Sequence, residues 1–163
     1  MSTTIEKHRL GVSTPSEREI VLKRTFDAPR DLVWQAVTKP EHVAKWYGCD
    51  ESTVAVCEID LRVGGAWRYV IRMAQGEEFG FHGVYNEIIE PKKIVSTEVF
   101  EPMPDFESLN TMVLEEREGR TTLTTTVLHG SPEARDGHLN SGMEVGAGQS
   151  FDRLEDLLQS LTV

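Results

Sequence analysis

Hydrophobic and polar residues alternate along the middle of the chain, from about residue 53 to residue 129. Such alternation is typical of strands that have one face buried and one face in water. It predicts strands at residues 53–60, 66–73, 78–89, 93–101, 109–118 and 120–129. Most links between these segments are too short to cross over a sheet, so successive strands must pair antiparallel, as in a meander.

Before this region the chain contains one strand and then a helical pattern. The strand is predicted at residues 20–26, where hydrophobic residues dominate. Pro29 then falls in the first turn of a short helix. The spacing of Thr38 and Glu41 is that of a capping box, and it predicts a second short helix that ends before Gly48.

A single apolar stripe runs along the C-terminal segment. Its residues are three or four positions apart: Met143, Ala147, Phe151, Leu154, Leu158 and Leu161. The stripe predicts a long amphipathic helix that begins with a capping box at Ser141 and lies on the sheet. Before it, Ser131 can cap a single helical turn that Gly137 ends. Gly146 and Gly148 indicate either a close backbone approach or room for a ligand.

Together these elements predict one α+β domain over residues 19–163. In it, a curved, seven-stranded antiparallel sheet wraps around the long C-terminal helix, and two short helices follow the first strand. Gly83, inside the longest strand, is expected to mark a bend or a bulge. Residues 1–18 have no sustained apolar period, so we expect a flexible extension or at most an added edge strand. Deleting residues 1–15 should then leave the thermal midpoint nearly unchanged.

Several motifs of the chain also occur in a known family. They are the turn Asp60-Leu61-Arg62-Val63-Gly64-Gly65, the segments Asp27-Ala28-Pro29-Arg30 and Lys45-Trp46-Tyr47-Gly48, and the ending Phe151-Asp152-Arg153-Leu154. With these motifs, residues 19–161 resemble the Hsp90-ATPase-activator-homologue branch of the START-like (SRPBCC) helix-grip superfamily. The resemblance implies a cavity between sheet and long helix that holds lipids, polyketides, hormones or other apolar molecules. The co-chaperone that names the branch has a separate N-terminal domain that this chain lacks, so we do not expect a co-chaperone role.

The strand after the paired glycines places large side chains on alternating faces. Trp67 and Tyr69 share one face, while Arg68 and Arg72 point to the other. The candidates for ligand contact are inward-facing aromatic and methionine side chains, namely Trp46, Trp67, Tyr69, Phe79, Phe81, Met112, Met143 and Phe151. For each of them, core packing is the alternative interpretation. The set as a whole favours a ligand, because its irregular shapes and polar groups suit a tightly filled core less well.

The polar residues form no recognisable catalytic or metal motif. His82 is expected to point outward and to form a hydrogen bond. Glu98 would be a buried carboxylate if its face were the inner one, but the favoured interpretation is the solvated edge of a half-buried strand. His129, Asp136 and His138 match no familiar zinc spacing. The usual nucleophile and phosphate-binding motifs are also missing from the sequence, so we expect no catalytic residue, no metal and no cofactor.

The charge of the chain restricts its partners. With 27 acidic and 17 basic residues among 163, the net charge is -10, which disfavours binding to nucleic acid and to anionic membranes. No apolar run is long enough to span a bilayer, so we expect no membrane insertion and a cytoplasmic location. Cys49 and Cys57 have neither the number nor the spacing for a disulfide framework or a zinc site, so both are interpreted as free thiols.

These features favour one function over two others. The favoured function is the non-enzymatic binding of a small apolar or aromatic molecule between the sheet and the C-terminal helix. A protein-interaction module would need an exposed apolar patch. A cyclase or hydrolase acting on a bound apolar substrate would need a polar residue with a shifted pKa inside the cavity. The expected partner is therefore a small molecule, with a protein partner as the alternative.

Overall fold

The computed structural model of the protein describes residues 8–162. In these residues, eight strands form one antiparallel sheet in the order β1-β2-β8-β7-β6-β5-β4-β3, and there are four helices. The strands are β1 (Gly11–Ser13), β2 (Glu19–Phe26), β3 (Ser52–Ile59), β4 (Ala66–Met73), β5 (Glu78–Ile89), β6 (Lys93–Phe100), β7 (Glu107–Arg117) and β8 (Arg120–Leu128). The helices are α1 (Arg30–Thr38), α2 (Pro40–Trp46), α3 (Pro132–Leu139) and α4 (Met143–Leu161).

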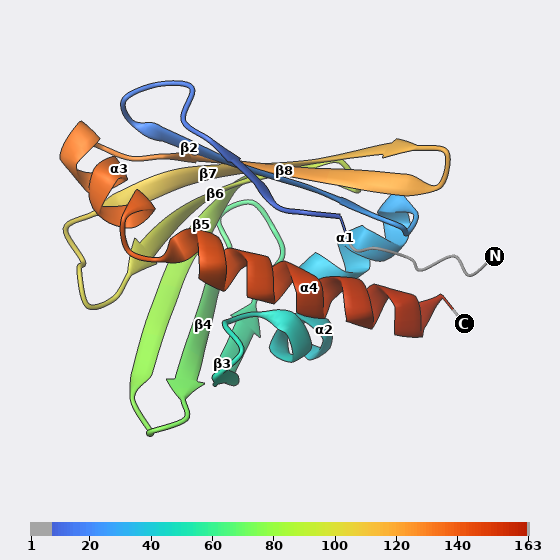
Figure 1. Ribbon diagram of the computed structural model, residues 1–163, viewed down its shortest axis with the longest axis horizontal. Helices are drawn as coiled ribbons and strands as arrows, with labels where there is room; N and C mark the ends of the chain where they lie inside the picture. Colours follow the sequence, from blue (N-terminus) through green and yellow to red (C-terminus); the bar gives the residue numbers. More distant parts are fainter. Residues whose placement is uncertain (1–7, 163) are drawn as a thin grey trace.

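The sheet curves, and α4 crosses its concave side (Figure 1). Strands β3, β4 and β5 turn away from the direction of β2, β7 and β8, while α1 and α2 lie beside the C-terminal part of α4. Strands β3 to β8 pair in chain order, and β2 pairs with β8. This arrangement confirms the predicted meander and the curved antiparallel sheet with a C-terminal helix. No helix within residues 8–162 is long and apolar enough to cross a membrane.

The sheet has eight strands rather than the predicted seven. The additional strand, β1, pairs with the edge of β2 in a register that places Gly11 opposite Lys23. Such pairing uses backbone N–H and C=O groups, so it needs no hydrophobic period that a sequence could reveal. Leu10, just before β1, packs against both hydrophobic clusters. Part of the expected extension, residues 1–18, therefore belongs to the sheet, while residues 1–7 lie outside the described residues.

Deleting residues 1–15 is now expected to lower the thermal midpoint, contrary to the expectation from sequence. The deletion removes β1 and the Leu10 side chain, at a cost of about 2 kcal/mol. For a chain of this size, each kcal/mol shifts the midpoint by about 2 to 4 °C. Scanning calorimetry measures the shift. A second variant that lacks only residues 1–7 keeps β1 and Leu10, so the difference in midpoint between the two deletions gives the contribution of β1 and Leu10 to stability. An unchanged midpoint in the longer deletion would show that β1 adds nothing to stability.

The starts of α2 and α4 differ from the predicted capping boxes. Thr38 is the last residue of α1, and its hydroxyl donates to the Trp34 carbonyl at 2.6 Å, so no side chain caps α2. The Ser141 hydroxyl donates to the His138 carbonyl at 2.6 Å, and α4 begins after Gly142 in a left-handed conformation with φ 85°. Both hydroxyls bond to the preceding helix because its last carbonyls lie within their reach.

Helix α3 begins as predicted and ends later. The Ser131 hydroxyl accepts a hydrogen bond from the Ala134 N–H at 3.1 Å, which confirms the cap. The helix continues past Gly137 and has 8 residues, more than the single turn that the sequence predicted. Docking against β2 and α4 supports the longer helix in spite of the glycine.

Gly83 does not mark the bulge of β5. It pairs in regular register with Trp67, and the register shift lies between Tyr85 and Glu87 instead. A Cβ at Gly83 would overlap the Thr97 carbonyl oxygen and lie 2.7 Å from Nε1 of Trp67. Glycine is therefore needed here for a close approach of neighbouring atoms rather than for a bend.

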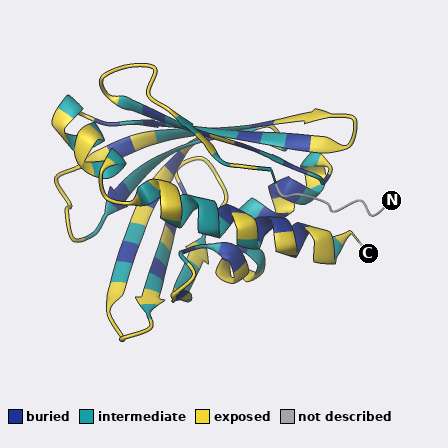
Figure 2. Ribbon diagram, in the orientation of Figure 1, coloured by how far each residue is buried: buried dark blue, intermediate teal, exposed yellow. Residues whose placement is uncertain are grey.

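The two halves of α4 are buried to different degrees (Figure 2). The C-terminal half buries Phe151, Leu154 and Leu158 in the main core cluster. The first half, residues 143–150, has no fully buried side chain. The predicted apolar stripe is thus confirmed as core for the C-terminal half only, and the contact between helix and sheet is less complete over the first half.

Candidate functional site

Aromatic side chains gather on the inner face of the sheet, the face that α4 crosses. Tyr69 pairs with Phe81 across β4 and β5, and Phe81 pairs with Phe100 across β5 and β6, so these rings project to the same side. Tyr47, directly after α2, packs on them, with its ring centroid 4.8 Å from that of Tyr69 and 5.9 Å from that of Phe81. The ring of Phe79 adjoins that of Phe100 at 6.1 Å. We call these side chains the inner aromatic group: Tyr47, Tyr69, Phe79, Phe81 and Phe100.

The inner aromatic group is surrounded by protein but is not fully buried. Each of its members is half-buried, whereas Phe26 and Leu154 in the adjoining core are 0% exposed. On α4, a Cβ added to Gly146 or Gly148 would meet no atom within 4 Å. These two glycines therefore border open space rather than a close backbone approach, and for Gly148 that space is a hollow that His8 and Asp152 also line, away from the aromatic rings. Since its members are half-buried, each ring of the group keeps a part of its surface that the described residues do not cover.

Glu98 lies on the same inner face, on β6 before Phe100. Its carboxylate accepts a hydrogen bond from the Asn110 amide at 3.2 Å, and Asn110 accepts one from the Ser108 hydroxyl at 3.2 Å. Burial raises the pKa of Glu98. Burial and then the charge of Glu98 raise the pKa of Tyr47 well above its usual value. The solvated edge that the sequence favoured for Glu98 is therefore wrong, because the strand pairing turns this residue to the inner face.

The other titratable groups of this region are uncharged at neutral pH. Burial raises the pKa of the Cys57 thiol to about 11 and raises the pKa of both Tyr69 and Tyr85. A thiol or phenol with such a pKa keeps its proton, so it can donate a hydrogen bond but is not an activated nucleophile. Among the described residues around the inner aromatic group, Glu98 is therefore the side chain that can carry a charge.

Two predicted ligand contacts, Trp46 and Phe151, belong to the packed core. Their rings stack with centroids 6.3 Å apart, and each residue is 9% exposed. The indole N–H of Trp46 donates to the Ala36 carbonyl at 2.9 Å. The Phe151 ring meets Phe26 edge-on at 5.9 Å. Both side chains form the packed surface beside the inner aromatic group.

The other predicted ligand contacts lie in two separate parts of the structure: Trp67 and Met112 lie at the main core cluster, and Met143 lies at a second cluster. Trp67 packs against Tyr69 at 4.8 Å, and its buried indole N–H has no hydrogen-bond partner within residues 8–162. Met112 is half-buried against the same core cluster as Trp67. Met143 packs on a separate cluster around Ile20. The structure therefore brings most of the candidates together and places Met143 apart from them.

Sequence reasoning did not select Tyr47, Phe100 or Asn110. Tyr47 follows the end of α2, where no period indicates the direction of a side chain. Glu98 and Phe100 are two positions apart on β6 and share one face of the strand. The correct choice of the inner face of β6 would therefore have identified both as residues of the site. Asn110 became apparent only from its bond to Glu98 on the neighbouring strand.

The histidines lie outside this region. His82 points outward as predicted, with Nδ1 2.9 Å from the Glu101 carboxylate. Hydrogen bonds from Arg68 and then from His82 lower the pKa of Glu101 to about 2. His129 and His138 meet at 2.9 Å between Nε2 and Nδ1. In residues 8–162, no group of three or more side chains is arranged to hold a metal ion.

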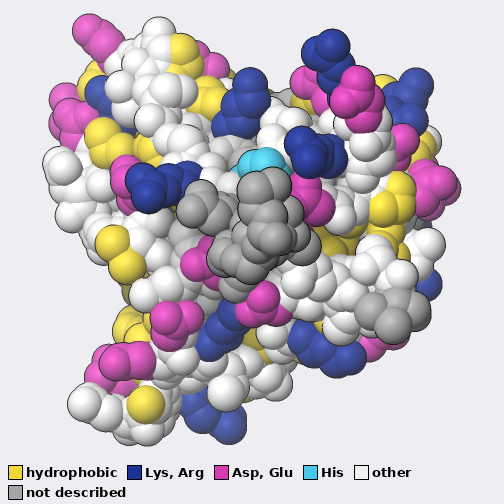
Figure 3. All heavy atoms as spheres, turned by 45° about the vertical axis from the view of Figure 1, so that its right-hand side comes forward, with side chains coloured by type: hydrophobic (Ala, Val, Ile, Leu, Met, Phe, Trp, Pro, Cys, Tyr) yellow, Lys and Arg dark blue, Asp and Glu magenta, His cyan; other side chains and the backbone are white. Residues whose placement is uncertain are grey.

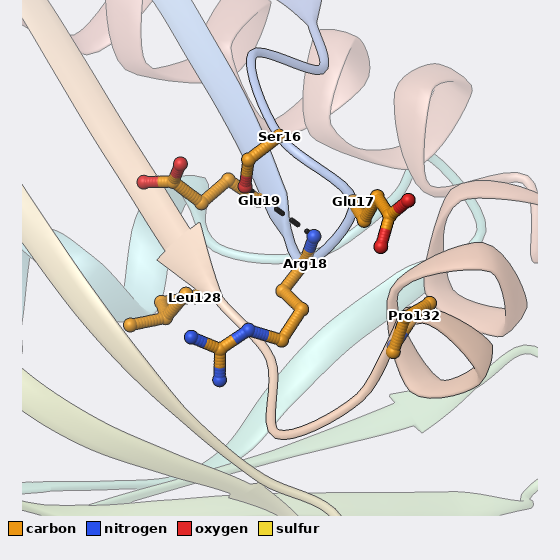
Figure 4. Close-up of a pocket in the computed structure, with 6 residues that line it drawn as sticks. All are labelled: Ser16, Glu17, Arg18, Glu19, Leu128 and Pro132. Atoms are coloured by element: carbon orange, nitrogen blue, oxygen red, sulfur yellow. Dashed lines mark hydrogen bonds between the residues drawn. The ribbon is translucent and has the colours of Figure 1, made fainter.

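Two hollows of the surface also lie away from the inner aromatic group. The first is lined by Ser16, Glu17, Arg18, Glu19, Leu128 and Pro132. In it the Arg18 side chain extends toward Leu128 (Figure 4), and the carboxylates of Glu17 and Glu19 point to opposite sides. The second, of about 310 Å³, is lined by His8, Arg9, Leu10, Arg24, Gly148 and Asp152. Neither hollow includes a predicted ligand contact.

The chain is similar to several solved structures. A protein from Rhodobacter sphaeroides is 25% identical, with a TM-score of 0.86, over 93% of this chain and 99% of that chain. A protein from Nitrosomonas europaea is 26% identical, with a TM-score of 0.82, over 91% of this chain and 99% of that chain. The AHSA1-like protein from Aeromonas hydrophila is 16% identical over 85% of this chain and 93% of its own, and with a TM-score of 0.69 it shows the shared fold alone.

A family model matches most of the chain. Its description is "Activator of Hsp90 ATPase homolog 1-like protein", and the match covers residues 27–159. No curated protein matches the chain. The matched range includes α1, α2, strands β3 to β8 and most of α4. The chain therefore belongs to the Activator of Hsp90 ATPase homolog 1-like family.

Proposed function

We propose that this protein binds a small apolar or aromatic molecule between the inner face of the sheet and α4, without catalysing a reaction. The proposal rests on the incomplete burial of the inner aromatic group beside a packed core. Small-molecule sites are usually lined by apolar and aromatic side chains with a few polar groups among them. The proposed contacts are Trp67, Tyr69, Phe79, Phe81 and Met112, with Trp46 and Phe151 as the packed surface beside them.

Family membership and two polar groups support this proposal. START-like domains of this family commonly bind ligands or interact with proteins. The Trp67 indole N–H is buried without a partner in the described part of the chain. A buried donor left unpaired costs about 1 to 3 kcal/mol, and a ligand acceptor would recover part of that cost. The Tyr69 hydroxyl, on the same strand face, forms a hydrogen bond with the Tyr85 hydroxyl and has a further lone pair that can accept from a polar group of the ligand.

The polar groups of the site favour binding over catalysis. Cys57 and Tyr69 keep their protons at neutral pH because burial raises the pKa of each. Nucleophilic catalysis needs a nucleophile in hydrogen-bond contact with a base. Within residues 8–162, Glu98 bonds to the Asn110 amide, which is neither a nucleophile nor a base.

A protein-interaction function has less support. Exposed large hydrophobic side chains are spread over the β3–β4 turn at Val63, the β6–β7 loop at Phe106 and α4 at Val145. On the face seen in Figure 3, acidic and basic side chains are interspersed and hydrophobic ones appear only in small groups. Protein-binding surfaces usually present a larger contiguous apolar patch.

Screening apolar and aromatic compounds by thermal shift tests the proposed function. A ligand at about 100 times its Kd adds about 2.7 kcal/mol to the free energy of unfolding, or about 5 to 10 °C for a chain of this size. Tyr69→Phe removes one oxygen atom, and Trp67→Phe removes the indole N–H together with two ring carbons, a loss of volume whose effect on folding a melting curve of that variant measures. We expect both variants to fold normally and to bind the ligand about fivefold more weakly, because each loses a hydrogen bond of about 1 kcal/mol.

Val84→Ala is the matched control for these variants. Val84 is 40% exposed on the outer face of β5, so its loss should leave ligand affinity unchanged. The proposal would be contradicted if no compound stabilises the protein and if the neutral apolar dye N-phenyl-1-naphthylamine shows no saturable fluorescence increase with it.

A further inference from the structure

We propose that the ligand of this site is an organic cation, an ammonium group on an apolar or aromatic body, with its charge held by Glu98 and by the ring faces of the inner aromatic group. This inference rests on the proposed function, because it names the class of molecule that the same site takes. Its basis is the placement of Glu98, Asn110 and Tyr47.

Among the described residues Glu98 has no basic partner, unlike Glu101, the next acidic residue of the chain. The Glu101 carboxylate binds the Arg68 guanidinium at 2.8 Å. Within residues 8–162, Glu98 bonds to the neutral Asn110 amide. A carboxylate shielded from water is costly unless a cation or several hydrogen-bond donors balance it. A cationic ligand would supply the balancing charge that the described part of the chain does not.

The aromatic rings beside Glu98 suit the same ligand. Aromatic ring faces carry negative electrostatic potential and attract cations that lie within about 6 Å of the centroid. The Tyr47 ring brings Tyr69 and Phe81 together, at 4.8 Å and 5.9 Å between centroids. Glu98 is two positions before Phe100 on β6 and so shares its inner face, and the Phe100 ring lies 5.0 Å from that of Phe81, which places the carboxylate and the rings on one face of the sheet. Clusters of aromatic ring faces are used by proteins to recognise ammonium groups, and a carboxylate beside them adds attraction between opposite charges.

The charge of the surroundings also favours a cation over an anion. The titratable groups in and beside the inner aromatic group are Tyr47 after α2, Cys57 on β3, Tyr69 on β4 and Tyr85 on β5. All of these side chains are neutral at neutral pH. None of them forms an ion pair with Glu98, as a lysine or arginine would, so none competes with a cationic ligand for the carboxylate. The net charge of the chain, -10, attracts cations from solution. An anionic ligand would instead be repelled by Glu98.

Competition between two molecules of matched shape tests the role of charge. Benzyltrimethylammonium and neopentylbenzene differ in that a cationic nitrogen in the first replaces a neutral carbon in the second. Each is titrated into protein loaded with N-phenyl-1-naphthylamine, and the loss of dye fluorescence reports displacement. We expect the cation to displace the dye at a concentration about tenfold lower than the hydrocarbon does.

Glu98→Gln separates the effect of the carboxylate from that of the rings. Glutamine keeps the size of the side chain and the acceptor for Asn110, so the variant should fold, which a melting curve checks. Its preference for the cation should fall to about twofold or less. Glu115→Gln removes the same charge from an exposed position on β7, and its preference should match that of the unmodified protein.

Two results would contradict the proposal that the ligand is a cation. They are equal displacement of the dye by both molecules in the unmodified protein, and a preference for the cation that survives Glu98→Gln. Either result would leave the proposed function intact, because the dye still binds and is still displaced. A protein that binds neither the dye nor either molecule would refute the proposed function itself. The comparison in the unmodified protein decides the matter even if Glu98→Gln fails to fold.

Discussion

Replacing Leu154 or Leu158 with alanine is expected to destabilise the protein by about 2 to 5 kcal/mol. Both side chains are 0% exposed and lie in the C-terminal half of α4, in one core cluster with Phe26 and Trp34. Alanine would leave a cavity that these closely packed neighbours can fill only in part. Urea denaturation measures the effect as a shift in midpoint, with the slope unchanged if unfolding stays two-state.

Val145→Ala provides the control on the same helix. Val145 is 66% exposed, so its replacement should change stability by less than about 0.5 kcal/mol. If both leucine variants lose less than about 1 kcal/mol, α4 does not bury its stripe in the core, and the site between α4 and the sheet would have to be abandoned as well.

Replacing Gly83 with alanine is expected to cost about 3 kcal/mol or more, or to prevent folding. The new Cβ would overlap the Thr97 carbonyl oxygen, a backbone atom of β6, and would lie 2.7 Å from Nε1 of Trp67. Backbone atoms inside a sheet cannot move aside without loss of the strand pairing. Unfolding in urea, with tryptophan fluorescence as the signal, reports both the stability and the displacement of the Trp67 ring.

Gly146→Ala makes the same chemical change where there is space for it. No atom lies within 4 Å of a Cβ at Gly146, which is inside α4, so alanine should stabilise the protein by up to about 1 kcal/mol. The two glycine variants are thus expected to have effects of opposite sign. Unchanged stability in Gly83→Ala would mean that β5 and β6 are not paired as closely as described.

Local patterns were sufficient to place the main elements of the fold. The predicted strands at residues 66–73 and 78–89 have the bounds of β4 and β5. Alternation and short links act between neighbouring residues, so they can be recognised without knowing the rest of the structure. The motif that begins at Asp60 likewise indicated the family that the chain belongs to.

The choice of inner face was predictable on some strands and not on others. On β4 the outward Arg68 and Arg72 make the inward face evident. On β6 both faces mix apolar and polar residues, so alternation alone does not tell whether Glu98 is inside. The pairing of β6 with β5 and β7 decided this, because paired residues project to the same side.

What the sequence determined by itself is therefore the order of the elements, their periods and the family. What only the tertiary structure decided is the added strand β1, the helix starts at Lys39 and Gly142, and the incomplete burial of the first half of α4. It also brought Tyr47 to Tyr69 and Asn110 to Glu98. Each of these features depends on contacts between segments that are distant in the chain or on backbone groups that every residue has, and neither leaves a periodic pattern in the sequence.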